Sequence, residues 1–366
     1  MPDCLKKIHI MHLTTDSAIG GTEKMIVEIA SSLSKNHFQS TVVTLKPGGC
    51  LEQLCKKKGV KYISVKMKSK LDFPAVLRLF KLIKNSNVDI LHTYLFHANI
   101  LGRVIGRLCK VPAIFSGQRN VDLWRKKHHN LIDRLTFKFC AGIISNSSAG
   151  KDFLIRHVGI HEDKLIIVPN GIDVENCKLV KRKPDKFIYI AVVASLTSKK
   201  GHTYLFRAFK KLLVDNKNVK LNIIGDGPLK SELEKLSYNL KINKNINFLG
   251  FQDNIIKHLE QTDIFVLPSL WEGMPVALME AMACGLPCLA TNVGRVGELI
   301  DNNVNGLLVE PKDVDALYES MLILIKISSE ERDKLGTKAR EKIKEFYSKK
   351  AMITKLEKIY LGVNVK

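Results

Sequence analysis

The stretch from residue 263 to 291, DIFVLPSLWEGMPVALMEAMACGLPCLAT, constrains the fold more than any other part of the chain. Residues 263–267 form an apolar run of strand length, and Pro268 ends it. A polar loop follows, and Pro275 stands where a helix accepts proline, at its first position. Gly285 ends that helix before a second short apolar run. The stretch therefore predicts a strand, a loop, a helix and a second strand.

In an open α/β sheet, ligands bind beyond the carboxyl ends of the strands, where helix N-termini present free N–H groups. Here that place is Glu272-Gly273-Met274-Pro275. Glu272 and Glu280 are eight residues apart, which is roughly 12 Å along a continuous helix. An acid/base pair of the glycosidase type needs about 5 to 9.5 Å between its carboxyl groups. We therefore expect two different roles, with Glu272 at the reacting group and Glu280 further back on the helix.

Apolar runs of strand length alternate with helical patterns along the whole chain, which is typical of doubly wound parallel sheets. At 366 residues the chain is longer than one α/β core usually is, so two domains are expected. We expect the domains to be 1–170 and 171–345, with a last helix at 346–366 that packs back on the first. Strands are expected at 7–13, 40–45, 60–65, 88–92, 113–116, 142–146, 165–168, 187–194, 219–225 and 246–249, and helices at 22–35, 73–85, 202–214, 229–240, 313–327 and 329–346.

The chain is strongly basic, with 58 Lys and Arg against 36 Asp and Glu and a net charge of +22. Such a charge favours nucleic acid, an anionic membrane surface or phosphorylated substrates. No zinc-finger, basic-zipper or RNP pattern accompanies the charge, so no nucleic-acid partner is expected. The amphipathic helix 73–85 could lie on an anionic membrane or pack its apolar stripe on the sheet. The Trp-containing loop 121–129 is the better candidate for membrane contact, with a role as a domain anchor as the alternative.

No apolar run approaches the roughly 18 residues that span a bilayer, and the first apolar segment is too short for a secretory signal. The eight cysteines lack zinc or redox spacing and are expected to be free thiols. There is no HExxH pattern, so no metal site is expected. These features favour a cytoplasmic protein.

Three turns after strands of the second half look able to hold a diphosphate, because each combines glycine or a cation with a helix start. They are 195–201, which contains Lys200, then 225–228 with Gly225 and Gly227, and 292–298 with Gly294 and Arg295. None has the spacing of a P-loop or of a dinucleotide fingerprint. In the first half, Gly20 and Gly21 precede a helix and would let the backbone approach a ligand, with a simple tight turn as the alternative.

These residues resemble the retaining glycosyltransferases of family 4, which have the GT-B fold. The resemblance rests on Gly20-Gly21, the sequence PNGID at 169–173, Lys200-Gly201, the GDGP turn at 225–228, and the E-x7-E spacing of Glu272 and Glu280 in its EGMP and EAMACGLP context. It covers nearly the whole chain. It implies two Rossmann-like domains facing a central cleft, an acceptor-binding N-terminal one and a donor-binding C-terminal one.

The resemblance also implies transfer of a sugar from a nucleotide-sugar to an acceptor hydroxyl, with retention of configuration and with no metal or cofactor. In that family Glu280 would hold the ribose hydroxyls, Lys200 the diphosphate, and Glu272 with the N–H groups of Gly273 and Met274 the donor sugar. Such cations and N–H groups would stabilise the charge that develops on the leaving nucleoside diphosphate.

Two positions depart from the family pattern. Ser195 stands where many members carry a phosphate-binding Arg, so Arg295 is the candidate for the second cation. Arg119 stands where many members carry a His; because a guanidinium cannot act as a base at neutral pH, we expect Arg119 to bind phosphate or orient the acceptor. His97 is a further candidate for the catalytic site, with a helix-capping role as the alternative.

The leading hypothesis is a glycosyltransferase at the inner face of the membrane. It would use a UDP-sugar, for example a UDP-N-acetylhexosamine, and a lipid-linked acceptor in surface polysaccharide or lipopolysaccharide synthesis. The first alternative is a nucleotide-sugar-binding protein of the same fold with impaired turnover, prompted by Ser195. The second is a nucleic-acid binder, which only the charge supports.

Overall fold

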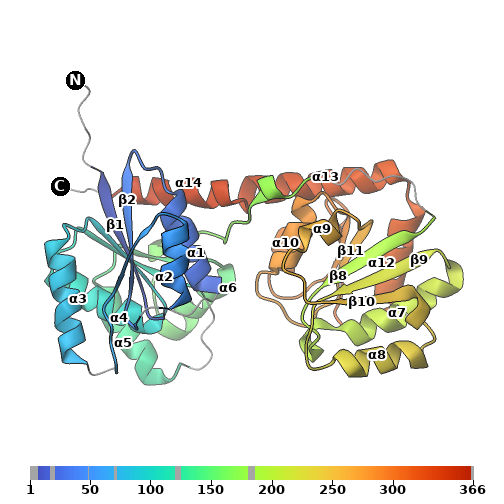
Figure 1. The fold of residues 1–366 in the computed structure, drawn as a ribbon, viewed down its shortest axis with the longest axis horizontal. Helices are drawn as coiled ribbons and strands as arrows, with labels where there is room; N and C mark the ends of the chain where they lie inside the picture. Colours follow the sequence, from blue (N-terminus) through green and yellow to red (C-terminus); the bar gives the residue numbers. More distant parts are fainter. Residues whose placement is uncertain are drawn as a thin grey trace. The chain divides into compact units, whose positions relative to one another are not determined.

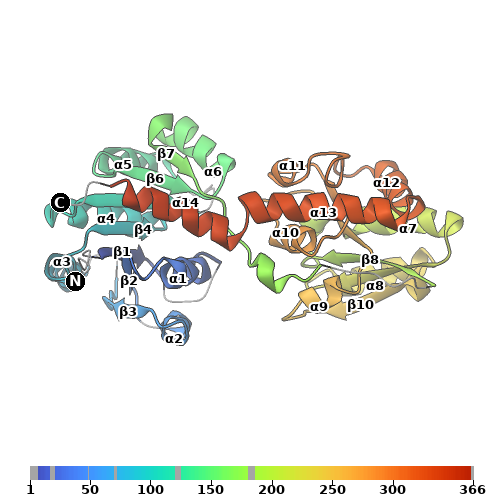
Figure 2. The same cartoon turned by 90° about the horizontal axis from the view of Figure 1, so that it is seen from above.

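The computed structural model describes residues 7–16, 21–47, 49–69, 72–119, 125–179 and 186–363, and these form two compact units. The first unit draws on residues 1–170 and 352–366, and the second on residues 171–351. Each unit has its own parallel sheet covered by helices on both faces (Figures 1 and 2). The chain thus has the two Rossmann-like domains of a GT-B fold.

The first sheet has seven strands in the order β3-β2-β1-β4-β5-β6-β7, and every neighbouring pair is parallel. Its order reverses between β1 and β4, which pair from Ile10 with Ile90 to Thr14 with Tyr94. The strands are β1 (Ile8–Thr14), β2 (Phe38–Thr44), β3 (Lys61–Ser64), β4 (Ile90–Tyr94), β5 (Ala113–Gln118), β6 (Gly142–Ser145) and β7 (Leu165–Ile167).

Successive residues of β1 point to opposite faces of the first sheet, and a layer of helices covers each face. Met11 and Leu13 pack with α3 (Phe73–Asn85) and α4 (Phe96–Leu108), and α4 also packs on α5 (Lys127–Phe137). Ile10 packs on the opposite face with α1 (Gly21–Ser32) and α14 (Lys349–Leu361), the last helix of the chain. The remaining helices of this unit are α2 (Cys50–Lys57) and α6 (Ser148–Phe153).

The second sheet has six parallel strands in the order β10-β9-β8-β11-β12-β13, and its order reverses between β8 and β11. Its strands are β8 (Ile188–Val193), β9 (Val219–Ile224), β10 (Ile246–Gly250), β11 (Ile264–Leu267), β12 (Cys288–Thr291) and β13 (Leu307–Val309). Its helices are α7 (His202–Asp215), α8 (Lys230–Asn239), α9 (Ile256–Leu259), α10 (Val276–Ala283), α11 (Val296–Leu299), α12 (Val314–Lys326) and α13 (Ser329–Phe346).

Three local expectations were wrong. Pro275 is the N-cap of α10 and not its first helical residue, because its ψ of 104° is still extended. Strand β4 runs to Tyr94, beyond the expected end at His92, because the polar Thr93 is buried and bonded to Asn99 and Ser116. The loop expected at 121–129 gives way to α5 at Lys127, and its Trp124 lies outside the described residues.

Candidate active site

Both reversals of strand order create the kind of crevice where open α/β sheets bind ligands, at the carboxyl ends of the two central strands. In the second unit these ends belong to β8 and β11. The turn after β8 carries Lys200, and the loop after β11 carries Glu272. Two of the residues singled out from the sequence are therefore brought together by the topology of one sheet.

Lys200 and Glu272 form an ion pair at this reversal, with 2.6 Å between Nζ and Oε1. Ser269 donates a second hydrogen bond to the same Oε1, also at 2.6 Å. The two loops are held to each other by the backbone, since Leu270 N donates to Lys199 O at 2.7 Å. Glu272 Oε2 accepts no hydrogen bond from the described residues, so this side of the carboxylate is available to a ligand.

Glu280 lies in the second turn of α10 and has a different environment from Glu272. Its carboxylate makes no side-chain hydrogen bond or ion pair within the part of the chain that the structure describes. Burial raises the pKa of the Glu280 carboxyl above its usual value. A desolvated carboxylate without a donor is costly for the fold and well suited to accept hydrogen bonds from ligand hydroxyls.

The glycines proposed as donor-binding residues fall into two kinds. A Cβ on Gly225, Gly227 or Gly294 would collide with the backbone of Ala194, Leu196 or Glu272, respectively. These three glycines are thus required by the packing of the loops around the site. Gly273 is different, because a Cβ there would meet no atom within 4 Å, so its backbone borders open space beside Glu272.

Met274 and Pro275 lead from Gly273 into α10, and Met274 also packs against the core of the second unit. Pro275 ends the loop as the N-cap of the helix. The backbone of this loop is tied to the next turn, since Arg295 N donates to Gly273 O at 3.3 Å.

Arg295 is buried and forms a two-pronged ion pair with Glu298, in which Nε donates to Oε1 at 2.9 Å and the second terminal nitrogen donates to Oε2. The charge of Arg295 is therefore compensated within its own turn. If Arg295 is to act as the second phosphate-binding cation in place of Ser195, it must share its guanidinium with Glu298.

In the first unit, Arg119 follows β5 directly and is buried at the carboxyl edge of the sheet. It donates to Asn170 Oδ1 at 3.0 Å, and its guanidinium lies 5.5 Å from the centre of the Tyr94 ring. Its Nε has no hydrogen-bond partner among the described residues, and no carboxylate there pairs with it. Arg119 is thus a buried cation that still has a donor to offer.

His97 lies in the first turn of α4, at the same edge of the first sheet, and its side chain is exposed. The N-cap of α4 is Leu95, which forms no side-chain cap. Gly21 is the first residue of α1, and a Cβ there would meet no atom within 4 Å. Gly20 lies outside the described residues.

A buried group of polar rings lies beneath this edge, and the sequence patterns did not single it out. Tyr94 hydroxyl shares hydrogen bonds with Nδ1 of His12 at 3.0 Å and of His92 at 2.9 Å, and Tyr360 of α14 reaches His92 at 2.6 Å. Burial lowers the pKa of His12 to about 3, with smaller effects from His9 and Arg119. The histidines that interrupt the apolar runs of β1 and β4 were the available signal for this group.

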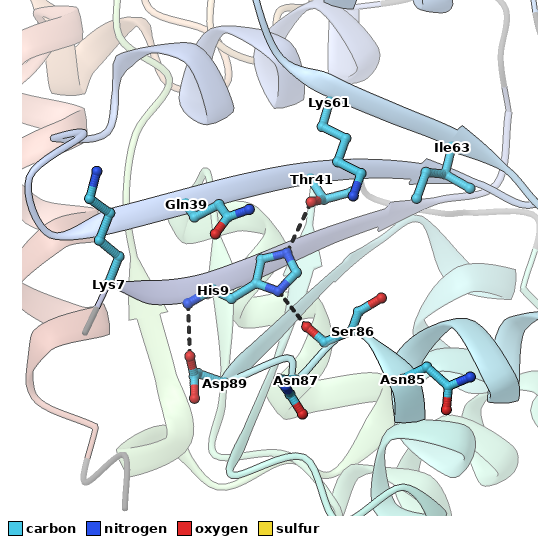
Figure 3. Close-up of a pocket in the computed structure, with 10 residues that line it drawn as sticks. All are labelled: Lys7, His9, Gln39, Thr41, Lys61, Ile63, Asn85, Ser86, Asn87 and Asp89. Atoms are coloured by element: carbon cyan, nitrogen blue, oxygen red, sulfur yellow. Dashed lines mark hydrogen bonds between the residues drawn. The ribbon is translucent and has the colours of Figure 1, made fainter.

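A pocket of about 620 Å³ lies elsewhere in the first unit, at the amino ends of β1, β2 and β3 (Figure 3). His9 spans it, with Nδ1 2.8 Å from Ser86 O and Nε2 2.9 Å from Thr41 Oγ1. Because ligands of parallel sheets bind at the opposite edge, this pocket is not part of the candidate active site. No group of three or more potential metal ligands occurs within the described ranges.

Comparison with known proteins shows the family of the chain. A family model described as "Glycosyltransferase Family 4" matches residues 19–176, and one described as "Glycosyl transferases group 1" matches residues 173–342. The chain belongs to the family 4 glycosyltransferases. In the parts of this glycosyltransferase that the structure describes, no helix is both long and apolar enough to cross a membrane.

Relatives and a solved structure match three quarters or more of this glycosyltransferase. It is 25% identical to the Escherichia coli "UDP-Gal:alpha-D-GlcNAc-diphosphoundecaprenol alpha-1,3-galactosyltransferase", over 98% of each chain. It is 27% identical to the Campylobacter jejuni "N-acetylgalactosamine-N,N'-diacetylbacillosaminyl-diphospho-undecaprenol 4-alpha-N-acetylgalactosaminyltransferase", over 75% of this chain and 76% of the relative. Its fold matches that of Anabaena HepE in complex with UDP, with a TM-score of 0.82, 17% identity, and coverage of 96% and 99% of the two chains.

Proposed function

We propose that this glycosyltransferase moves a sugar, with retention of configuration, from a UDP-sugar to a lipid-linked oligosaccharide acceptor in the synthesis of a surface polysaccharide or lipopolysaccharide. The observation that carries the proposal is the meeting of Lys200, Glu272 and Ser269 where the second sheet reverses its strand order. The printed names of the two relatives, each a transferase acting on a diphospho-undecaprenol-linked sugar, support the class of acceptor. The UDP bound to the structural neighbour supports the class of donor.

In this proposal the ribose, diphosphate and sugar of the donor bind to different residues along the carboxyl edge of the second sheet. Glu280 accepts hydrogen bonds from the ribose hydroxyls, and Lys200 moves from Glu272 to the diphosphate. Glu272 and the N–H groups at Gly273 and Met274 then hold the sugar. The bond between the sugar C1 and the β-phosphate oxygen breaks, the acceptor oxygen bonds to C1, and UDP leaves with the acceptor proton. The cation beside the phosphates stabilises the charge that develops on UDP.

The acceptor side of the proposal rests on the first unit. Arg119 is a buried cation with an unused N–H group, which suits an anionic group of the acceptor better than proton transfer. His97 is exposed at the same edge and is proposed to contact the acceptor sugar. The enzyme would act as a peripheral protein at the inner face of the membrane, where such acceptors are held.

The direct test of donor binding is a thermal-shift screen of UDP, GDP and ADP and their hexose and N-acetylhexosamine derivatives. UDP and one UDP-sugar should stabilise the protein by about 2.7 kcal/mol at one hundred times their dissociation constants. Lys200→Ala should weaken UDP binding by about tenfold or more, since a charge-assisted contact to phosphate is lost. Lys199→Ala is the matched control, because its ammonium lies over the exposed Trp271 ring, 5.9 Å from the centroid. Equal affinities of the two variants would contradict the role of Lys200.

A catalytically impaired nucleotide-sugar-binding protein is the second candidate. Ser195 provides no cation beside the diphosphate position, and Arg295 is already paired with Glu298. Acceptor-dependent release of UDP distinguishes the two candidates: the transferase releases UDP when a lipid-diphosphate sugar is added, whereas the binding protein shows donor affinity without release. The configuration of the product, read from its anomeric NMR coupling, tests retention.

A further inference from the structure

The excess of positive charge is concentrated in one segment of the chain. Residues 61–138 contain sixteen Lys and Arg against four Asp and no Glu, a net charge of +12 out of the chain's +22. This segment includes α3, α4 and α5, which cover one face of the first sheet with α4 packed between the other two (Figures 1 and 2). Seven of the sixteen cations lie within these three helices, and all of them except Arg103 are outside the buried core. The layer is therefore part of the most basic region of the chain.

The outer face of this layer carries no exposed carboxylate. The single acidic residue within the three helices, Asp133, is buried and bonded to Arg103 and to Arg125, the latter at 2.7 Å. Asp72 caps α3, and its carboxylate accepts from the backbone of Lys68 at 2.9 Å and of Ala75 at 3.0 Å. The exposed cations on the layer thus have no exposed acidic neighbours within these helices.

The same face exposes large apolar side chains that do not pack in the core of the first unit. In α3 the residues facing the core are Ala75, Leu79 and Ile83, whereas Phe73 and Leu77 point outward. The other exposed side chains are Leu108 of α4 and Leu131, Ile132 and Leu135 of α5, and the exposed fractions of all six lie between 41% and 73%. In α5 the three occur at helical spacing and form an outward stripe. Helix α3 therefore has a buried apolar face and further apolar side chains that are exposed, whereas α5 buries only Asp133 and exposes its apolar residues.

We propose that the outer face of α3, α4 and α5 docks on an anionic lipid bilayer. Aliphatic and aromatic side chains would enter the boundary between head groups and acyl chains, while Lys81, Lys84 and Lys127 would pair with lipid phosphates. A protein partner with a mixed-charge surface would require acidic counterparts on this face, and the three helices offer none exposed. The sequence led us to expect membrane contact through the loop 121–129 or through α3 alone. The proposed docking face instead combines α3, α4 and α5.

This inference rests on the proposed function, because membrane docking would serve a transferase whose lipid-linked acceptor has its head group at the same bilayer. The N-terminal ends of α4 and α5 point to the carboxyl edge of the first sheet, where His97 and Arg119 lie. A bilayer on the outer face of the layer would bring the diphosphate of a lipid-linked acceptor near that edge.

The test is co-sedimentation of the full chain with vesicles of equal parts phosphatidylglycerol and phosphatidylcholine, and with vesicles of phosphatidylcholine alone. The protein should bind the anionic vesicles at least about tenfold more tightly, and added salt should weaken that binding. The double substitution Leu131→Glu and Leu135→Glu should weaken binding by about tenfold or more, and so should Lys81→Glu with Lys84→Glu. Val214→Glu is the matched control, since Val214 is as exposed but lies on α7 of the second unit.

Two further readouts separate the outcomes. Thermal unfolding shows whether the α5 double variant is folded, and transfer to a short-chain, water-soluble acceptor should remain in that variant, which separates docking from the proposed activity. Vesicle binding that persists in a protein without any transferase activity would leave the docking face intact and contradict only the proposed function. Equal binding to both vesicle types, an α5 double variant that binds like Val214→Glu, or a solution dimer that this variant abolishes without vesicle binding would overturn the docking face.

Discussion

At the scale of single residues, Glu272 and Glu280 show how one helix and the loop before it hold two carboxylates in different environments. Glu272 has two donors, Lys200 and Ser269, on one oxygen. Glu280 has no side-chain partner in the described structure, and its burial raises its pKa. A paired carboxylate stabilises the empty protein, whereas a desolvated and unpaired one destabilises it until a ligand arrives.

Glu280→Gln should therefore separate stability from binding. The substitution removes a desolvated charge, so the free energy of unfolding should stay unchanged or rise by up to about 1 kcal/mol. UDP affinity should fall by about tenfold, because an amide accepts hydroxyl hydrogen bonds more weakly than a carboxylate. Urea unfolding and isothermal titration measure the two quantities. A less stable variant with unchanged UDP affinity would show that Glu280 has a structural role.

The buried His12 predicts a pH dependence of stability. Its folded pKa is lowered to about 3, mainly by burial, while an unfolded histidine has a pKa of about 6.5. Below pH 6.5 the unfolded chain binds a proton that the folded chain does not, so this stabilisation is complete above pH 6.5 and is lost as the pH falls toward 3. The slope is about 1.4 kcal/mol per pH unit for one such histidine.

His12→Gln should remove that slope for one site, because glutamine can bond Tyr94 without titrating. Urea unfolding of the first unit between about pH 6 and pH 4.5 should show a shallower loss of stability in the variant, by about 1.4 kcal/mol per pH unit. His92 of the first unit, whose pKa burial also lowers, should maintain part of the remaining slope. Identical slopes in the two proteins would mean that His12 is protonated in the folded state.

At the scale of elements, the site depends on how closely three loops of the second unit pack. Gly294 has a φ of +56° and lies against the backbone of Glu272, so it is needed for the loop geometry itself. A Cβ at Gly273 would meet no atom within 4 Å, so packing does not require a glycine at this position. The sequence marks both as glycines of a ligand-binding turn, and only the structure separates these two reasons.

Gly273→Ala and Gly294→Ala form a matched pair. Gly273→Ala should leave the melting temperature nearly unchanged and reduce affinity for the UDP-sugar by about tenfold, if the sugar lies against that backbone. Gly294→Ala should lower stability by more than about 1 kcal/mol, because alanine is strained at positive φ and its Cβ meets the Glu272 carbonyl. Thermal unfolding with and without the UDP-sugar gives both results. Loss of stability in Gly273→Ala would remove the argument for open space beside Glu272.

Helix α14 is the element whose contribution can be isolated most cleanly. Its Leu356 is fully buried in the core of the first unit beside Ile10 and Ile29. Leu356→Ala should cost about 2 to 5 kcal/mol in the stability of the first unit. UDP binding, assigned to the second unit, should be retained at temperatures where that variant is folded. Loss of UDP affinity in a folded Leu356→Ala protein would contradict the assignment of donor binding to the second unit alone.

Many of the helices and strands could be predicted from the sequence, because short apolar runs and helix stop signals alternate regularly along it. The helices 73–85 and 329–346 begin and end at the predicted residues. Strand β13 could not be found, since three residues after a polar turn carry too little pattern. The buried His12, His92 and Tyr94 were also missed, because polar residues in a strand give no sign that other buried polar groups will meet them.

At the scale of the whole molecule, the proposed function divides the chemistry between the two units. The second unit supplies the carboxylates, the Lys200 ammonium and the open backbone of Gly273, while the first unit supplies Arg119, His97 and the basic layer of α3, α4 and α5. The sequence motifs are dense in the second unit and sparse in the first. The predicted donor half therefore rests on many residues and the predicted acceptor half on two, and both remain predictions.

The most direct test of sugar transfer is the rate at which labelled sugar passes from its UDP-sugar to a short-chain lipid-diphosphate acceptor. The wild-type protein and Glu232→Gln, a substitution at an exposed position of α8, should transfer at the same rate. Glu272→Gln should be slower by about a hundredfold or more, since its carboxylate lies at the proposed transfer centre. No transfer by the wild-type protein with any UDP-sugar, or an unimpaired Glu272→Gln variant, would contradict the account.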